Sequence, residues 1–301
     1  MEIQIVEFFK SWSCKFCDVL FSFTNLLGED LFFYLVFFML YWAYRKEYVY
    51  KFALVYAVNS AFNVVFKKIV KRPRPIGATA DGYSFPSGHS QSYSAVGTSL
   101  LYEANKNHYP AKKWLRIEFL IEVIVCGLLV AIGRMYFGQH YLTDVIAGLM
   151  FGVIVTVLVT YILDLIIERV KKNPKITLGK VLLCILPLVI VGYVVVACTN
   201  IFEDPEDLAK IYRIVGIYCA VVVSYFVDKK WIQYNPDDTI KNKMLKLGSG
   251  MATMIVLYVM FAKDANVNAF LPIYYFIIGI VGLIVLPWIF KTIKNPEEVK
   301  E

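Results

Sequence analysis

Nine long apolar runs, joined by short charged connections, are the feature that most limits what this chain can fold into. They cover roughly residues 31–44, 49–66, 89–104, 116–133, 141–167, 181–199, 211–227, 245–262 and 269–290. A helix needs about 20 apolar residues to cross a bilayer. With 58% hydrophobic and only 18% charged residues, the chain has too little charge for a soluble domain of this length. The sequence therefore predicts an all-α fold, a polytopic membrane helical bundle.

The distribution of charge predicts how such a bundle is oriented. The net charge is +7, and most of the 31 basic residues lie in alternate connections and in the C-terminal tail, Lys175, Lys294 and Lys300 among them. Because basic residues favour the cytoplasmic side, we expect the C-terminus inside and the N-terminus outside. The acidic stretch 203–207 then lies outside. Basic residues at span ends are not typical of nucleic-acid binding, so we expect no nucleic-acid partner.

Basic and polar residues gather at the end of the second run and in the loop that follows it. Asn59, Asn63 and Lys67 are four residues apart and therefore share one face of a helix. Arg74 follows them in a loop rich in Lys, Arg and Pro. Basic residues at the end of a span ordinarily anchor it in the interface, but that does not explain so much positive charge in an external loop. A bound anion explains it.

The third run begins at Pro86-Ser87-Gly88-His89, a sequence suited to the start of a helix. Proline and serine favour the first helical positions, and glycine lets the backbone approach a ligand closely. The N–H groups at such a helix N-terminus can hold phosphate, with the Ser87 hydroxyl as one more donor. His89 is placed to give or take a proton.

A further polar stretch, Gly133 to Asp144, contains Arg134, His140 and Asp144. If a helix begins near His140, the histidine and the aspartate four residues later lie on one face. The carboxylate can then hold one imidazole nitrogen and leave the other free and basic, beside Arg134 as an anion clamp. The same pair is also typical of a purely structural hydrogen bond, and this stretch alone does not decide between the two.

Taken together, the three stretches resemble the signature motifs of the type 2 phosphatidic-acid phosphatase superfamily. Lysine, six residues and Arg-Pro match at 67–75, Pro-Ser-Gly-His matches at 86–89, and arginine, five residues, histidine, three residues and aspartate match at 134–144. The likeness covers about residues 50–165. The family usually has serine where this chain has Gly133, so one hydroxyl is missing here.

This resemblance implies a six-helix phosphatase core, and the last spans resemble a transmembrane extension seen in some bacterial members. We accordingly expect an N-terminal amphipathic surface helix within residues 1–30, the core at 31–200 and additional C-terminal transmembrane helices at 201–301. The first thirty residues show no cleavable signal peptide. The purpose of the last spans, whether packing, substrate access or dimerisation, stays open.

The resemblance also implies the chemistry of the site. His140 would attack phosphorus and form a phosphohistidine, Asp144 would fix the tautomer of His140, and His89 would protonate the leaving oxygen and then activate water. The phosphoryl oxygens would be held by Lys67, Arg74, Ser87, Gly88, His89 and Arg134. The outer side offers no cluster of carboxylates for Mg²⁺ or Zn²⁺, so we expect no metal and no other cofactor.

The expected activity is hydrolysis of a lipid phosphate monoester or diphosphate at the extracytoplasmic face of the cell membrane. Undecaprenyl diphosphate and phosphatidylglycerophosphate are the substrates that the resemblance suggests, with phosphatidic acid as a further candidate. The motifs recognise phosphate and not the lipid tails, so they do not choose among these substrates. The partners are the lipid substrate and the bilayer, and a homodimer stays open.

Three other interpretations share the same anion site. Vanadium haloperoxidases are soluble, which nine apolar runs argue against. A non-catalytic lipid-phosphate binder or transporter needs the positive clamp but not His89, His140 and Asp144. A phosphatase of a small soluble phosphate ester also stays open. Cys14 and Cys17 form a Cys-x-x-Cys pair that lacks a second pair or a βαβ context, so we expect a structural role for it.

Overall fold

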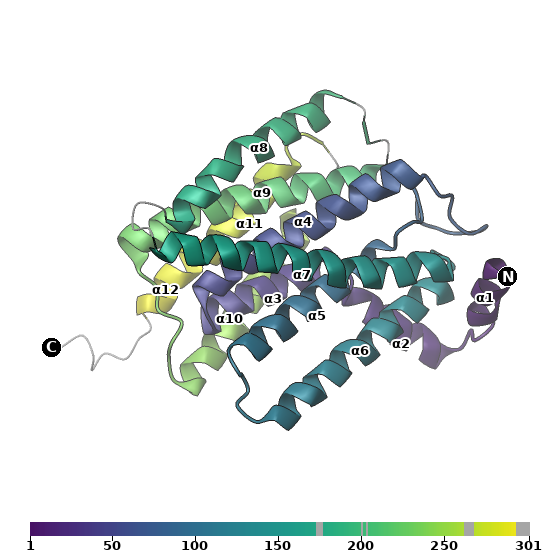
Figure 1. Cartoon of the computed structure of the whole chain (residues 1–301), viewed down its shortest axis with the longest axis horizontal. Coiled ribbons are helices and arrows are strands. Elements are labelled where there is room, and N and C mark those ends of the chain that lie inside the picture. The colour runs from purple at the N-terminus through teal and green to yellow at the C-terminus, as the bar shows by residue number, and fades with distance from the viewer. Residues whose placement is uncertain (173–176, 200, 203, 262–267, 293–301) are drawn as a thin grey trace. The chain divides into compact units, whose positions relative to one another are not determined.

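The computed structural model describes residues 1–172, 177–199, 201–202, 204–261 and 268–292, and every element in them is a helix (Figure 1). The elements are α1 (Glu2–Lys10), α2 (Lys15–Leu26), α3 (Asp30–Ala43), α4 (Lys46–Val70), α5 (Gly88–Lys106), α6 (Lys113–Tyr136), α7 (Leu142–Lys172), α8 (Leu178–Cys198), α9 (Pro205–Val227), η1 (Asp228–Ile232), α10 (Ile240–Phe261), α11 (Leu271–Ile280), η2 (Val281–Val285) and α12 (Leu286–Thr292). Glu203, Lys175, Lys294 and Lys300, which entered the orientation argument, lie outside the described residues, as does the C-terminus.

Each apolar run coincides with a helix, the last one with α11, η2 and α12 together. In the described part of the chain, six helices are long and apolar enough to cross a membrane, or seven if α2 and α3, bent by 54°, form one broken span. The all-α membrane bundle is therefore confirmed, but nine independent spans are more than length and composition support. The predicted spans at 89–104 and 116–133, which correspond to α5 and α6, are not among these six helices, and α5 is rich in serine.

The N-terminal segment differs from the single amphipathic helix expected within residues 1–30. It forms two helices, α1 and α2, with Cys14 as the N-cap of α2. Val6 is buried, and Ile5 and Phe9 pack against a small core of α6 and α7 residues. Helix α1 therefore docks on protein along one face, while Ile3 and Phe8 remain exposed on the other.

Packing divides the chain into two compact units, residues 1–34 with 54–164, and residues 35–53 with 165–301. The expected division at residues 30 and 200 stays a prediction. In the first unit, α5 and α7 approach closely through glycine. A Cβ added to Gly148 would lie 2.5 Å from the Ser87 carbonyl oxygen, and one added to Gly152 would lie 2.6 Å from that of Gln91. Backbone approach this close requires glycine on α7.

Buried amides connect α4 to α5 and α7 within the same unit. The Asn63 side-chain amide donates to the side-chain oxygen of Gln91 at 2.9 Å, and the Gln91 amide donates to the Asn59 carbonyl at 3.0 Å. The Asn59 amide donates to the Thr156 hydroxyl at 3.0 Å. The predicted polar face of α4 is thus turned inward, where these hydrogen bonds fix its register against its neighbours.

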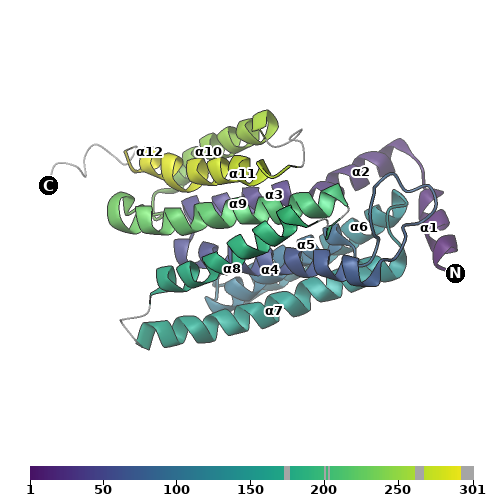
Figure 2. The same ribbon diagram turned by 90° about the horizontal axis from the view of Figure 1, so that it is seen from above.

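The second unit is organised around aromatic and small residues. The Trp42 indole donates to the Gly282 carbonyl at 2.8 Å, and the Tyr234 hydroxyl donates to the Trp42 carbonyl at 2.6 Å. Helices α9 and α11 lie side by side (Figure 2), with Gly216 against the Pro272 carbonyl. None of the residues that match the three motifs belongs to this unit.

Candidate active site

Four helix ends and two loops, one of which contains Arg74 and the other His140, supply the predicted site residues, and all of them belong to the first unit. Lys67 lies in the last turn of α4, and Arg74 lies in the loop that follows. Ser87 is the N-cap of α5. Arg134 lies in the last turn of α6 and Asp144 in the first turn of α7. The apolar helices thus end or begin at the polar side chains, so these polar groups gather at one end of the helices and not along their apolar lengths.

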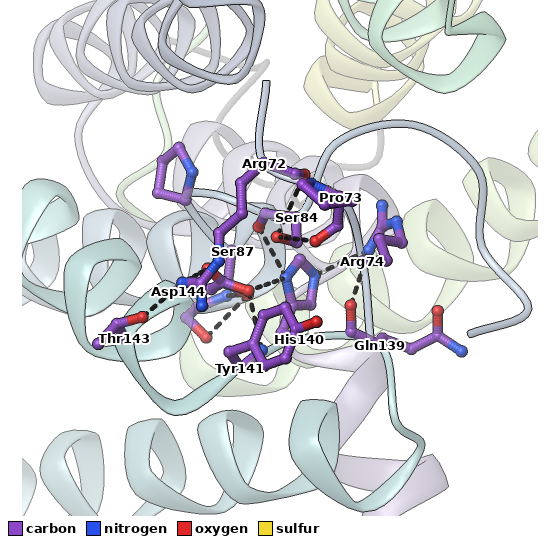
Figure 3. A network of polar contacts seen from close by, with 12 residues as sticks. Arg72, Pro73, Arg74, Ser84, Ser87, Gln139, His140, Tyr141, Thr143 and Asp144 are labelled. Carbon is purple, nitrogen blue, oxygen red and sulfur yellow. Dashed lines mark hydrogen bonds and ion pairs between the residues drawn. The ribbon is translucent and has the colours of Figure 1, made fainter. Parts of the chain in front are cut away.

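His140 is held on both ring nitrogens and is only 2% exposed. Its Nδ1 lies 2.8 Å from the Ser84 carbonyl oxygen, and its Nε2 lies 3.2 Å from Nη1 of Arg74 (Figure 3). Because a carbonyl only accepts hydrogen bonds, Nδ1 carries the proton and donates it to Ser84. The lone pair is then on Nε2, beside the Arg74 guanidinium. Sequence reasoning did not single out Ser84, because a backbone carbonyl leaves no signature in side-chain chemistry.

Asp144 is related to His140 less directly than the spacing predicted. Its Oδ2 lies 3.7 Å from the Nδ1 of His140 and accepts a hydrogen bond from the Tyr141 N–H at 2.8 Å. Helix α7 begins at Leu142, two residues after His140 as the sequence predicted, and this carboxylate caps the helix N-terminus in the manner of a capping box. The Ser84 carbonyl, and not Asp144, makes the close contact that fixes the tautomer.

Arg72 and Glu2 extend this network and were missed as functional candidates. Arg72 Nη1 donates to Asp144 Oδ1 at 2.8 Å and to the Thr143 hydroxyl at 2.5 Å (Figure 3), and its other terminal nitrogen pairs with Glu2. Glu2 also accepts from the Thr143 hydroxyl at 2.6 Å. The position of Arg72, next to Pro73 in the basic loop, was a usable signal, but nothing in the sequence connects Glu2 to residues 70 or 141 positions away.

The α5 N-terminus is joined to α7 through backbone contacts. The Ser87 N–H donates to the Asp144 carbonyl oxygen at 3.0 Å, and the Ser87 hydroxyl lies 3.1 Å from that of Ser90. Ser87 is fully buried and Gly88 is buried beside it. The N–H groups of the first helical turn have no intrahelical acceptors, so this is a suitable place for phosphoryl oxygens.

His89 is half-buried and faces a carboxylate. Its Nε2 lies 3.1 Å from Oε1 of Glu29, a residue of the α2–α3 connection. The neighbouring Gly28 approaches so closely that an added Cβ would lie 2.6 Å from the Cβ of His89. Glu29 is therefore a further residue that sequence reasoning missed, and it is the orienting partner of this histidine.

Lys67 and Arg134 are both buried, at 2% and 7% exposed. Arg134 Nη1 donates to the Asn25 side-chain oxygen of α2 at 2.8 Å. Beside it, a Cβ added to Gly133 would lie 3.4 Å from Phe21 of the same helix, an ordinary contact. The position at which the family usually has serine is thus covered by α2.

The electrostatic environment keeps His140 neutral. Burial of the imidazole lowers the pKa of His140 well below its usual range, and four nearby positive charges lower it further. These charges belong to Arg134, Arg74, Lys67 and His89. The structure therefore brings His140 into the field of the predicted clamp residues. Among the described residues, no group of three or more His, Cys, Asp and Glu side chains is arranged to hold a metal ion.

Comparison with known families explains this arrangement. Residues 48–168 match the PAP2 superfamily, and residues 212–297 match the transmembrane extension of PAP2 superfamily phosphatases. The chain contains a PAP2 superfamily domain followed by a PAP2 transmembrane extension. All three motifs, Lys67 to Pro75 included, fall within the first match, while Glu2, Asn25 and Glu29 precede it.

Named PAP2 relatives match only part of the chain. It is 32% identical over 109 residues to phosphatidylglycerophosphatase B of Bacillus subtilis, covering 35% of this chain and 53% of that protein. It is 32% identical over 125 residues to dolichyldiphosphatase of Saccharomyces cerevisiae, covering 37% of this chain and 50% of that protein. The chain thus spans about half the length of these relatives. A solved Bacillus subtilis PAP2-type phosphatidylglycerolphosphate phosphatase is 25% identical with a TM-score of 0.49, covering 54% of this chain and 84% of that one.

Proposed function

We propose that this protein is a membrane lipid phosphatase that hydrolyses a lipid phosphate monoester or diphosphate through a covalent phosphohistidine on His140. One observation supports this most directly. The buried imidazole is kept neutral, with its Nδ1 proton bound to the Ser84 carbonyl and its Nε2 beside Arg74. A lone pair among positive charges is what attack on an anionic phosphoryl group requires.

In the first step, the His140 Nε2 lone pair forms a bond to phosphorus and the bond from phosphorus to the leaving oxygen breaks. His89 gives its proton to that oxygen, and Glu29, 3.1 Å from its Nε2, holds the ring in place. Lys67, Arg74 and Arg134 balance the charge on the phosphoryl oxygens, together with Ser87 and the N–H groups of Gly88 and His89.

In the second step, water attacks the phosphohistidine. His89 now removes a proton from the water, a P–O bond forms and the N–P bond breaks, which releases phosphate and returns His140 to its neutral form. No metal enters either step, because the positive charge for the transition state comes from Lys and Arg. We propose that Asp144 contributes through Arg72 and the start of α7, which position the histidine just before the helix.

An apolar cavity supports a lipid as the substrate. It lies among α5, α6 and α7, has a volume of about 510 Å³, and is lined mainly by aliphatic and aromatic side chains such as Leu120, Ile124 and Val153. Tyr93 also lines it and is four residues after His89 on α5, so it lies on the same helix face one turn away. A cavity of this kind suits the hydrocarbon part of a substrate whose phosphate is bound at the helix ends.

The relatives suggest which lipids to test. Two of them are named phosphatidylglycerophosphatase B and dolichyldiphosphatase, so phosphatidylglycerophosphate and polyprenyl diphosphates such as undecaprenyl diphosphate are proposed first. We further propose that the reaction occurs on the extracytoplasmic face of the cell membrane. A non-catalytic lipid-phosphate binder and a phosphatase of small soluble esters are the alternatives that the experiment must distinguish.

The deciding experiment is phosphate release by the purified protein in detergent with EDTA present, over a panel of lipid monophosphates, lipid diphosphates and soluble esters. We expect release from a lipid that survives the chelator and falls by at least about 10³-fold in His140→Ala, because the nucleophile is lost. His108→Ala, in the α5–α6 connection, is the matched control and should keep full activity.

Each other outcome excludes a part of the proposal. Loss of activity on chelation contradicts the metal-independent mechanism. Release from soluble esters alone contradicts the lipid substrate. Lipid binding without any release, by protein that is folded and monodisperse, supports the binder. Acid-labile ³²P on the wild-type protein, absent from His140→Ala, identifies the covalent intermediate.

A further inference from the structure

The cysteine pair at the start of α2 lies outside the phosphatase machinery and has a geometry of its own. Cys14 and Cys17 are both free, and their Sγ atoms are 2.8 Å apart. Cys14 is the N-cap of α2, and its Sγ accepts the Cys17 N–H at 3.2 Å. The two sulfurs therefore face each other across the first turn of a twelve-residue helix, and no large movement separates them from a covalent bond.

The two cysteines differ in the way that disulfide exchange requires. Cys14 is exposed and Cys17 is less exposed, so an external reagent reaches Cys14 first. Hydrogen bonds from the Cys17 thiol and the Cys17 N–H lower the pKa of Cys14, which increases the fraction of reactive thiolate. The other four cysteines lie in α6, α8 and α9, far from this pair in the sequence.

We propose that Cys14 and Cys17 form a reversible dithiol–disulfide site that exchanges with external disulfides. The Cys14 thiolate attacks one sulfur of the disulfide, forms a mixed disulfide and releases the first thiol. Cys17 then attacks the Cys14 sulfur, which closes the Cys14–Cys17 disulfide and releases the second thiol. The pair loses two electrons and two protons, and the external disulfide gains both as two thiols.

This interpretation replaces the structural role expected from the sequence. A structural cysteine is typically buried in apolar surroundings and inert, whereas this pair is at the surface and caps a helix. A metal site is less well supported, because no group of three or more ligating side chains exists among the described residues. Exposure, sulfur contact and helix position all favour exchange chemistry.

The pair lies at the start of α2, next to the connection from α1. Both helices contact the candidate active site, α1 through Glu2 and α2 through Asn25. These residues contact Arg72 and Arg134 respectively. In α2, Asp18 also accepts a hydrogen bond from the Tyr136 hydroxyl at 2.6 Å.

The test equilibrates the purified full-length protein with defined ratios of reduced and oxidised glutathione and then labels the remaining thiols with a maleimide. We expect Cys14 and Cys17 to lose reactivity together, with a mass loss of about 2 Da in the N-terminal peptide as two hydrogens leave. Single substitutions separate the roles. Cys17→Ser should accumulate glutathione on Cys14, and Cys14→Ser should accumulate far less on Cys17.

Cys198, exposed near the end of α8, is the control within the same chain. In Cys17→Ser, we expect Cys14 to react with oxidised glutathione at least about tenfold faster than Cys198 at pH 7, since its thiolate fraction is higher. Two results would overturn the proposal. One is that both thiols stay fully labelled at the most oxidising ratio, and the other is that Cys14 reacts no faster than Cys198. Neither readout depends on phosphatase activity, so the proposal is tested independently of the proposed function.

Discussion

At the scale of single residues, the Ser84 carbonyl decides which nitrogen of His140 can react. Only Nδ1–H satisfies this acceptor at 2.8 Å, so Nε2 is left with its lone pair. An arginine 3.2 Å from Nε2 would repel a protonated imidazole. Burial and positive neighbours therefore act in the same direction, and both favour the neutral histidine that we propose as the nucleophile.

The lowered pKa of His140 leads to a prediction about stability and pH. In the unfolded chain this histidine binds a proton near pH 6.5, whereas in the folded protein it does so only at a much lower pH. As the pH falls below 6.5, the unfolded state binds more protons and the folded state loses stability, by up to about 1.4 kcal/mol per pH unit.

His140→Asn removes this titration and leaves every other group in place. Between pH 7.5 and pH 5, we therefore expect the melting temperature of the wild type to fall more than that of the variant, measured by differential scanning fluorimetry in detergent. Parallel curves for the two proteins would contradict a lowered pKa. Because His140 stays neutral in the folded protein over this pH range, we expect its protonation to make no contribution to the pH dependence of kcat/KM near pH 6.5.

At the scale of secondary-structure elements, helix α1 reaches the site through Glu2. Glu2 pairs with Arg72 and accepts from Thr143, while Arg72 binds the buried carboxylate of Asp144. The hydrogen bond from Thr143 is the main cause of the lowered pKa of Glu2. A helix outside the matched PAP2 region therefore stabilises the start of α7. Acidic groups near this helix N-terminus also interact favourably with the positive end of the helix dipole.

Glu2→Gln tests this role because it keeps an acceptor for Thr143 but removes the ion pair with Arg72. We expect kcat for the best lipid substrate to fall about fivefold, the equivalent of about 1 kcal/mol for a partly exposed pair, with little change in KM. Glu2→Asp should recover part of the loss. Glu7→Gln, on an exposed face of the same helix, should behave as wild type, and an equal effect in both variants would show that the helix acts only by docking.

Helices α5 and α7 offer a second test at this scale, because their close approach positions Ser87 beside Asp144. In Gly148→Ala the new Cβ would meet the Ser87 carbonyl oxygen at 2.5 Å, so the helices must separate. We expect a loss of about 1–3 kcal/mol of stability, seen as a lower melting temperature, together with reduced activity. Gly192→Ala in α8 is the matched control, since nothing lies within 4 Å of its new Cβ. Equal melting temperatures for Gly148→Ala and Gly192→Ala would contradict the prediction that the close packing at Gly148 sets the distance between α5 and α7.

At the scale of the whole molecule, the sequence predicted what depends on local pattern and missed what depends on packing. Apolar runs and the Pro-Ser-Gly-His start placed α3 to α12 and Ser87 correctly, because hydropathy and capping act over a few residues. The Glu2–Arg72 pair and the His89–Glu29 contact join residues 70 and 60 positions apart, and only tertiary structure brings them together. The two-helix N-terminus was missed because an amphipathic pattern does not show which apolar face meets protein.

The orientation of the chain in the membrane is the remaining prediction at this scale. The loop at 71–87 contains Arg72, Arg74 and Ser84, and the connection at 233–239 lies near several lysines. Five helices, α5 to α9, separate the two. If α5 and α6, which are not among the six candidate spanning helices, did not cross the membrane, three would remain. Either number is odd, so we predict that the two connections lie on opposite sides of the membrane.

Single cysteines in a cysteine-free variant test this directly. Ile76→Cys and Asp237→Cys replace side chains that are 93% and 89% exposed. A charged, membrane-impermeant maleimide therefore reacts with either cysteine when the reagent is on the same side of the membrane. In intact cells we expect labelling of Ile76→Cys alone, with Asp237→Cys labelled only after permeabilisation, because basic connections favour the cytoplasmic side. The reverse pattern would move the proposed reaction to the cytoplasmic leaflet. Labelling of both in intact cells would contradict an odd number of crossings, and with it the arrangement of spans between α5 and α9.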